Sequence, residues 1–380
     1  MTFDSNLFAR KIIKCRDLMH ASVEDVSEWT GIARERICIL EAGTEAPEGD
    51  EVLILADVYL KDFKHFISGD RPDEFDNSSI LYRALGLELT AADARNIQEF
   101  LYLCENEQML EEASDKRKRE FHHAVVGTNF KHQGKTGAEA LRAHLGIAPS
   151  EVLVNPYRCF RSIGVHIFRR KMDNSRISGL YVHHRQAGSC VLINYGEDVY
   201  RQIFTVCHEC AHSIFDREDS AVVSGKWNGT DLREVRANAF AGQFLIPDGV
   251  VQQHLRPITW SETVFRTWCD RLSVNAKTLS IRLKESGIID HAMAKRYGAI
   301  RINGQSKEDP EIPDEYTKSQ RIRALSLLDQ GLSGYYVRHG IEAFQQEKIS
   351  FDRLSELFMV ERIDLMSLLA EFQVAHSHGV

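Results

Sequence analysis

Apolar residues recur three and four positions apart along most of this chain, which is the spacing of helices that bury one face. Ser22 is placed to cap such a helix, and Thr30-Gly31 is a predicted turn into the next one. The pattern predicts a first domain of four or five short helices in residues 1–69, among them residues 7–18, 22–29 and 33–41.

The following segment keeps the helical pattern. Apolar residues hold helical spacing from about residue 79 to residue 131. Gly134-Lys135-Thr136-Gly137 then reads as a flexible hinge. We therefore expect a helical connector over residues 70–135.

After the hinge the pattern becomes mixed. Beyond a helix at 136–145, alternating apolar residues predict strands over 164–168, 178–182 and 190–194, the last two paired across a turn that contains Gly188. Beyond Pro247 helical spacing returns over 264–272, 276–286 and 351–372, with a polar linker at 303–314. We expect an α+β fold that is mostly helical, with a small sheet in residues 136–255 and a helical C-terminal domain, residues 256–380, packed against it.

Composition narrows the class of protein. The 380 residues are 43% hydrophobic and 27% charged, as in an ordinary soluble protein. No apolar run approaches the ~20 residues that cross a bilayer, and the N-terminus does not resemble a secretory signal. Eight cysteines without framework spacing favour a reducing compartment. We expect a cytoplasmic protein that does not bind membranes, and the net charge of −8 argues against non-specific nucleic-acid binding by the whole molecule.

The strongest chemical pattern is His208-Glu209-Cys210-Ala211-His212. Histidines four positions apart lie on one helical face, so their ring nitrogens converge on one point. This is the spacing of an HExxH zinc site, where the glutamate accepts a proton from the activated water. We predict that His208 and His212 bind Zn²⁺ and that Glu209 is the general base.

A catalytic zinc site needs a third protein ligand and one open position. Residues 233–247 predict a second helix that Pro247 ends, and Glu234 lies in its first turn. Glu234 is therefore the candidate third ligand, which makes the centre gluzincin-like.

From about Leu141 to Pro247 the chain resembles the ImmA/IrrE family of metallopeptidases. The family pattern is a strand that ends in Asn, a helix with Arg, Phe and Thr before HExxH, and a later ExxAN-x-FA…P. The matching residues here are Ile193-Asn194, Arg201, Phe204-Thr205, His208 to His212, Glu234, Ala237, Asn238, Phe240, Ala241 and Pro247. The resemblance implies a zincin-like fold, zinc ligation by His208, His212 and Glu234, and Glu209 as general base. It also implies a characteristic substrate, a repressor with a helix-turn-helix domain.

Cys207 and Cys210 stand where that family usually has small aliphatic residues. They form a CxxC near a helix start, where the helix dipole favours a reactive thiol. A thioredoxin-like site would need a strand directly before the helix, and the strand at 190–194 is too distant. We expect two small core residues; the alternative is a thiol switch at the zinc, with Cys190 as the best-placed blocking thiol.

Residues 1–69 resemble the Cro/repressor (XRE-like) type of helix-turn-helix domain, through the run from Ile37 to Pro47. The reading helix carries apolar Cys38, Ile39 and Ala42 where polar groups usually contact DNA, which leaves Arg34 and Arg36 as candidate DNA contacts. Acidic residues outnumber basic ones by 13 to 8 in this segment, which opposes phosphate binding. The domain either binds duplex DNA or recognises another helix-turn-helix protein or the peptidase.

Further candidates follow from position. The basic run Lys116, Arg117, Lys118 and Arg119 is most simply a solvated helix face, and its alternative is a contact to single-stranded DNA as an activating signal. In zincins the strand before the active-site helix takes the substrate backbone by strand addition. The residues of that predicted edge are Val191, Ile193 and Asn194, and candidates for stabilising the oxyanion are Tyr181, His183, His184 and Tyr195.

These patterns predict a zinc-dependent endopeptidase that cleaves a regulatory protein, most simply a helix-turn-helix repressor, and so derepresses stress, phage-defence or mobile-element genes. One alternative is a DNA-binding transcription regulator whose zinc domain is a sensor. Another is a toxin–antitoxin component. The pattern predicts no oligomeric state.

Overall fold

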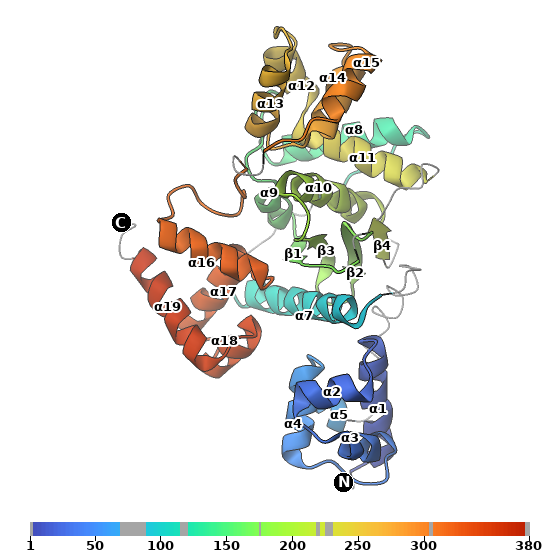
Figure 1. Cartoon of the computed structure of the whole chain (residues 1–380), viewed down its shortest axis with the longest axis vertical. Helices are drawn as coiled ribbons and strands as arrows, with labels where there is room; N and C mark the ends of the chain where they lie inside the picture. Colours follow the sequence, from blue (N-terminus) through green and yellow to red (C-terminus); the bar gives the residue numbers. More distant parts are fainter. Residues whose placement is uncertain are drawn as a thin grey trace. The chain divides into compact units, whose positions relative to one another are not determined.

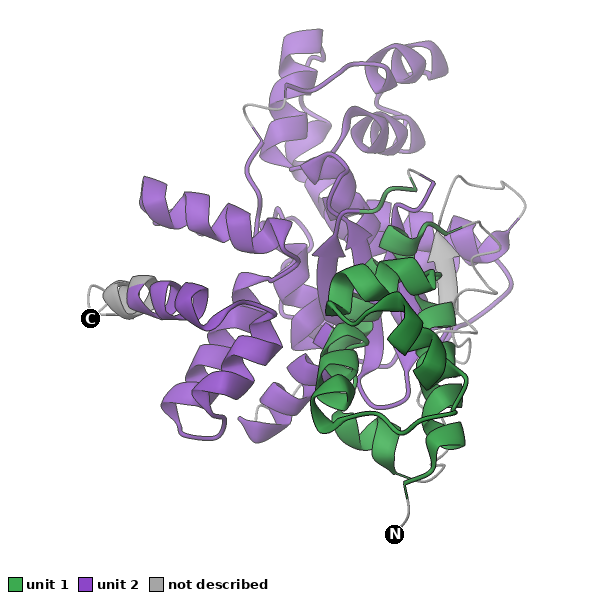
Figure 2. Cartoon of the chain, turned by 60° about the horizontal axis from the view of Figure 1, so that its bottom comes forward, with its two compact units in different colours: residues 1–102, 172–175 green, residues 103–171, 176–380 purple. Residues whose placement is uncertain are grey.

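The computed structural model describes residues 3–68, 89–114, 121–174, 176–217, 221–224, 231–303 and 307–376 (Figure 1). The chain divides into two compact units, residues 1–102 with 172–175 and residues 103–171 with 176–380 (Figure 2). The first half of helix α7 (Ala91–Ala113) belongs to the first unit and the second half to the other. Each unit is described by itself.

The first unit begins with five short helices, α1 (Ser5–Leu18), α2 (Val23–Thr30), α3 (Arg34–Glu41), α4 (Gly49–Val58) and α5 (Phe63–Ile67). Ser22 caps α2 through a capping box with Asp25, and Gly31 ends it in the left-handed conformation at φ 70°. Apolar side chains from all five helices form one core, including Phe8, Ile12, Val26, Leu40, Leu55 and Phe66. The predicted short helices are therefore confirmed.

The second unit contains a four-stranded mixed sheet. Its strands are β1 (His166–Arg170), β2 (Gly179–His184), β3 (Gly188–Asn194) and β4 (Ala221–Ser224), in the order β1-β3-β2-β4. β3 pairs in parallel with β1 and antiparallel with β2, and β2 pairs antiparallel with β4. The predicted hairpin around Gly188 is confirmed, at φ 74° for that glycine.

One face of the sheet carries the largest core. Tyr181, Val191 and Ile193 are buried there with side chains of α10 (Val199–Phe215) and α11 (Leu232–Leu245). Helices α8 (Phe130–His144) and α9 (Pro156–Ser162) contribute to the same core. Because neighbouring strand residues point to opposite faces, Leu180, Val182 and Leu192 are buried on the other face.

The predicted hinge at residues 134–137 is wrong. Gly134 and Gly137 lie inside α8, and Gly134 is where that helix approaches α11. A methyl group at Gly134 would stand 2.3 Å from the carbonyl oxygen of Arg236 and 2.9 Å from the backbone nitrogen of Phe240. The glycine allows two helices to pack closely and does not mark a flexible joint. The helical prediction is also wrong for residues 121–129, which are irregular.

The C-terminal part of the chain is helical, as predicted. After α11 come α12 (Asp248–Val250), the π-helical turn η1 (Val251–Leu255), α13 (Glu262–Arg271), α14 (Ala276–Glu285) and α15 (His291–Gly298). Beyond the 303–314 segment lie α16 (Lys318–Asp329), α17 (Gly334–Gln345), α18 (Phe351–Phe358) and α19 (Arg362–His376). The aromatic ring of Tyr336 on α17 packs edge-on against Phe168 of β1 at 5.5 Å between centroids.

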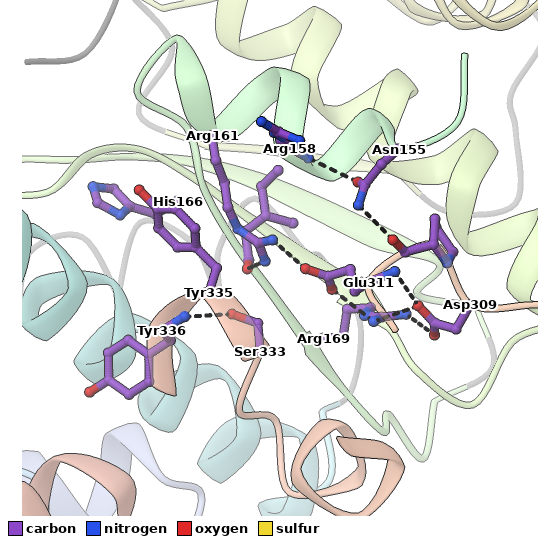
Figure 3. A network of polar contacts seen from close by, with 12 residues as sticks. Asn155, Arg158, Arg161, His166, Arg169, Asp309, Glu311, Ser333, Tyr335 and Tyr336 are labelled. Carbon is purple, nitrogen blue, oxygen red and sulfur yellow. Dashed lines mark hydrogen bonds and ion pairs between the residues drawn. The ribbon is translucent and has the colours of Figure 1, made fainter. Parts of the chain in front are cut away.

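The segment predicted as a polar linker docks onto the sheet domain through buried ion pairs (Figure 3). Arg169 of β1 contacts Asp309 at 2.6 Å and Glu311 at 2.7 Å, and Arg161 of α9 also pairs with Glu311. Both guanidinium groups are almost fully buried. Asp309 and Glu311 of this segment are therefore partners of buried arginines, which the local pattern of the sequence does not show.

No helix in the described part of the chain is both long enough and apolar enough to cross a membrane.

Candidate metal centre

Helix α10 brings the two histidines to one face. Asp198 caps the helix by accepting a hydrogen bond from the backbone nitrogen of Tyr200 at 3.1 Å. Cys207, Cys210 and Ala211 on the opposite side are buried in the main core, which fixes the rotation of the helix. His208 and His212 consequently present their rings together, 5.1 Å apart between centroids.

Helix α11 supplies a carboxylate to the same point. Asp231 caps α11 by accepting from the backbone nitrogen of Arg233 at 2.9 Å, and Glu234 lies in the first turn. Glu234 places Oε2 3.2 Å from Nε2 of His208 and Oε1 3.2 Å from Nε2 of His212. The predicted helix and the predicted contact of these three residues are both present.

The three donor groups fit a divalent metal ion. Their ligand atoms all lie within 4.8 Å of one another, and both histidines are buried. Ligands about 2 Å from one zinc ion stand roughly 3–4 Å apart, so little rearrangement is needed. Two imidazoles and a carboxylate are also a donor set that zinc prefers.

Electrostatic coupling within the centre is strong. Burial alone would lower the pKa of His212, but hydrogen bonds with Asp216 and Glu234 outweigh it and raise this pKa to about 9. Burial would raise the pKa of Glu234, yet its contacts with His208 and His212 hold it far below the usual range. Without a metal, Asp216 and Glu234 therefore favour the protonated form of His212, and metal binding would displace that proton.

A second carboxylate orients His212. Nδ1 of His212 donates to Oδ2 of Asp216 at 2.7 Å, and Arg236 pairs with the other oxygen of Asp216. An Nδ1–H donated in this way directs Nε2 toward the ligand position. Asp216 and Arg236 were missed from the sequence, although Asp216 lies four residues after His212 on the same helical face.

The side chain of Glu209 extends from α10 to the sheet. Its side chain is fully buried, and it lies against the backbone of Gly179 in β2. A methyl group at Gly179 would stand 2.9 Å from Oε1 of Glu209 and 2.7 Å from Cγ2 of Thr205. Gly179, which was also missed, leaves room for the predicted general base beside the histidines.

The surroundings of the Cys207 and Cys210 thiols do not favour redox chemistry. Cys207 and Cys210 are fully buried, and burial raises the pKa of both thiols well above the usual range. They pack as the small core residues that we expected. Burial on this scale keeps the thiols protonated and so disfavours the thiol-switch alternative.

The prediction for Cys190 as a blocking thiol is wrong in its geometry. Cys190 pairs with Val182 in the sheet, whereas the residues that face α10 are Gly179, Tyr181, Val191 and Ile193. By strand alternation Cys190 points to the opposite face. There its thiol contacts Cys104 of α7 by a hydrogen bond.

The prediction of a substrate-binding edge at Val191, Ile193 and Asn194 is also wrong. Strand β3 is hydrogen-bonded to β1 on one side and to β2 on the other, so its backbone is not open to another strand. All three residues are buried. The edges of the described sheet are β1 and β4.

The four oxyanion candidates are dispersed. His184 contacts Glu105 at 3.1 Å, and Tyr195 lies against the guanidinium of Arg169 at 5.5 Å. His183 is exposed, while Tyr181 is buried in the core that α10 shares. Burial raises the pKa of Tyr181 to about 12, so its phenol stays protonated. The oxyanion role stays a prediction for all four.

The candidate DNA contacts of α3 are engaged within the first unit. Arg34 contacts Glu24 at 2.9 Å, and Arg36 contacts Glu51 at 2.7 Å and also pairs with Glu45. DNA binding would have to compete with these ion pairs, and it stays a prediction. The basic run Lys116, Arg117, Lys118 and Arg119 lies outside the described residues.

Comparison with family models agrees with this geometry. Residues 160–284 match the IrrE N-terminal-like domain of peptidase family M78. The IrrE N-terminal-like match covers about a third of the 380 residues. It runs from the end of α9 through most of α14 and includes His208, His212 and Glu234. It suggests a metallopeptidase of the ImmA/IrrE type. A comparison with curated proteins finds no match for the chain.

Proposed function

We propose that this protein is a zinc-dependent endopeptidase that cleaves a regulatory protein. The observation that carries the proposal is the meeting of His208 and His212 of α10 with Glu234 of α11, with all donor atoms within 4.8 Å. The IrrE N-terminal-like match over the same residues supports it. Glu209, the buried carboxylate next to His208, supplies the further group that hydrolysis requires.

Each residue has a role in that proposal. His208, His212 and Glu234 would hold zinc, and a bound zinc supplies a Lewis acid that activates water and polarises the scissile carbonyl. Glu209 accepts the proton of the attacking water at a side-chain oxygen and returns it to the leaving amine. Asp216 holds His212 in the required orientation through its hydrogen bond to Nδ1.

The substrate strand belongs at a different place from the one that the sequence predicts. Among the described strands β4 pairs with β2 alone, and it follows α10 directly in the chain. An extended substrate segment can add to an open strand edge through backbone hydrogen bonds. We assign substrate binding to β4, and the family resemblance supports a helix-turn-helix repressor as the substrate.

The proposal is tested with the unaltered protein and three variants, by two measurements. Elemental analysis gives the zinc content, and mass spectrometry of a proteome-derived peptide library gives cleavage without knowledge of the natural substrate. We expect His212→Ala to lose the zinc of this centre and all cleavage. Glu209→Gln should keep the zinc and lose about 10²–10⁴-fold in cleavage rate, because an amide cannot accept the proton.

The matched control is Glu197→Gln, which makes the same change at a partly exposed glutamate that lies just before α10 and pairs with Arg201 of that helix. It should keep both zinc and activity. Cleavage by Glu209→Gln at the rate of the unaltered protein would contradict the role of Glu209. Absence of cleavage by every protein, with zinc present, would favour the alternative of a sensor domain in a transcription regulator.

A further inference from the structure

A second cluster of metal-binding side chains lies in the second unit. Glu107 and Glu111 are four residues apart on α7, and His166 begins β1. Nδ1 of His166 is 2.8 Å from Oε1 of Glu107, and Nε2 is 4.0 Å from Oε2 of Glu111. One ligand atom from each of the three residues falls within 4.8 Å of the other two.

This cluster is separate from the centre on α10. His166 pairs with Cys190 in the parallel ladder, and Cys190 points to the face of the sheet that α7 covers. The next residue, Ile167, is buried in the core of the other face, with α10. The sheet therefore stands between the two clusters, and neither of the two shares a ligand with the other.

Burial makes the charge of this cluster costly. Glu107 and His166 are fully buried and Glu111 is 3% exposed. The neighbouring cations, Arg161 and Arg169, are paired with Glu311 and Asp309. Four carboxylates thus lie near two guanidinium groups, so acidic groups outnumber the arginines that pair with them. Uncompensated charge in a protein interior is strongly unfavourable.

An independent observation points to a ligand. Oε2 of Glu107 is buried and has no hydrogen-bond partner among the described residues, although the other oxygen of this carboxylate contacts His166. A buried carboxylate oxygen without a partner is rare in native proteins and indicates an ion or another missing group. Tyr335 of α17 donates to Oε1 of Glu111 at 2.8 Å, which fixes the second carboxylate toward the cluster.

We propose that Glu107, Glu111 and His166 form a second, structural binding site for a divalent transition-metal ion such as Zn²⁺ or Mn²⁺. A dication would offset this excess of acidic groups, and one imidazole with two carboxylates is a donor set for these ions. The ion would join α7 to β1 of the sheet. Because Tyr335 of α17 donates to Glu111, the ion would also stabilise the contact of α17 with α7. Its complete burial suits a structural role, because it leaves no access for a substrate.

The experiment measures metal stoichiometry in the full-length protein. Elemental analysis of the protein, stripped and reloaded with Zn²⁺ or Mn²⁺, should give two ions per chain. Glu107→Gln combined with Glu111→Gln should give one, and so should His208→Ala combined with His212→Ala. The control Glu105→Gln changes a carboxylate of the same helix that contacts His184 on β2, and it should keep two ions.

The outcomes separate this site from the proposed peptidase. One ion in the unaltered protein that is lost with His208 and His212 would overturn the second site and leave the peptidase proposal intact. One ion that survives that change and is lost with Glu107 and Glu111 would support the second site alone. If the Glu107 and Glu111 double variant does not fold, the double histidine variant decides: one retained ion, with a fall in Tm on chelation, supports the site, and no retained ion contradicts it.

Discussion

At the scale of single residues, His212 is the most constrained side chain of the metal centre. Its Nε2 faces Glu234, and its Nδ1 is fixed by Asp216, which in turn is held by Arg236. The Arg236 guanidinium is itself enclosed between the rings of Phe130 and Phe215, at 5.2 and 4.8 Å from their centroids. The orientation of one ligand thus depends on a chain of buried polar groups behind it.

Replacing Asp216 with Asn tests that chain. The amide keeps the shape but removes the negative charge, so His212 becomes a weaker ligand and Arg236 loses its buried counterion. We expect zinc affinity to fall about 10–100-fold, measured by competition with a coloured chelator. Asp198→Asn, at the start of the same helix, should leave affinity unchanged, since Asn caps helices as well as Asp does.

The two histidines of the metal centre were predictable because their proximity is local to one helix, α10. The four-residue spacing of His208 and His212 fixes their common face whatever the tertiary fold. The position of Cys190 could not be predicted in the same way. Which face of the sheet its thiol occupies depends on the register of β3 with β2, and a single-residue change of register would reverse it. The ion pair of Arg169 with Asp309 joins residues 140 positions apart in the chain, beyond any local pattern.

At the scale of elements, the packing of α8 on α11 fixes the position of Glu234. Gly134 lets the two helices approach until no methyl group fits between them. Arg142 of α8 reinforces the arrangement by donating to the carbonyl oxygen of Phe244 at 2.8 Å. The helix that carries the third ligand is therefore held by backbone proximity.

Gly134→Ala measures the closeness of that packing. Alanine favours a helix by roughly 1 kcal/mol over glycine, but the added methyl group would overlap the backbone of α11, which costs about 1–3 kcal/mol or more. We expect lower stability in denaturant unfolding. Gly334→Ala, at a helical glycine with open space, should be neutral or stabilising. Stabilisation by Gly134→Ala would instead indicate a loose hinge.

An ion pair between Lys131 of α8 and Glu285 of α14 makes a contribution to stability that depends on pH. Burial would raise the pKa of Glu285, but its ion pair with Lys131 at 2.5 Å outweighs burial and lowers it below the usual 4.5. Because the folded-state pKa is depressed, this contribution is complete above pH ~4.5 and is lost as pH falls through the lowered value.

Glu285→Gln should therefore reduce the free energy of unfolding by roughly 0.5–1 kcal/mol at pH 7, as expected for a partly exposed pair. The difference from the unaltered protein should shrink as pH falls below about 4.5. Urea unfolding of both proteins from pH 3 to pH 7 measures this. A difference that stays constant with pH would mean that packing, and not charge, is lost.

At the scale of the whole molecule, the helical and strand segments were largely predictable, and their arrangement was not. The strands of residues 178–194 were recognised from alternation and from the turn at Gly188. The order of the strands in the sheet was not predictable. β1 pairs with β3, the second strand of the hairpin, and β4 pairs with β2, the first. The hydrophobic pattern of a strand does not show which strands it pairs with, so the interior strand β3 was predicted to be an edge.

The placement of α7 and α8 decides where a fragment that carries the candidate metal centre can begin. The family match begins at residue 160, after both helices have ended. A fragment cut at that boundary would lose the helix that packs on α11 and the carboxylates that meet His166. It would also remove the cover that α7 gives to the sheet face around Cys190 and its partner Val182. An exposed apolar face favours association between molecules, so a fragment that keeps the candidate metal centre in its native surroundings should start near the middle of α7.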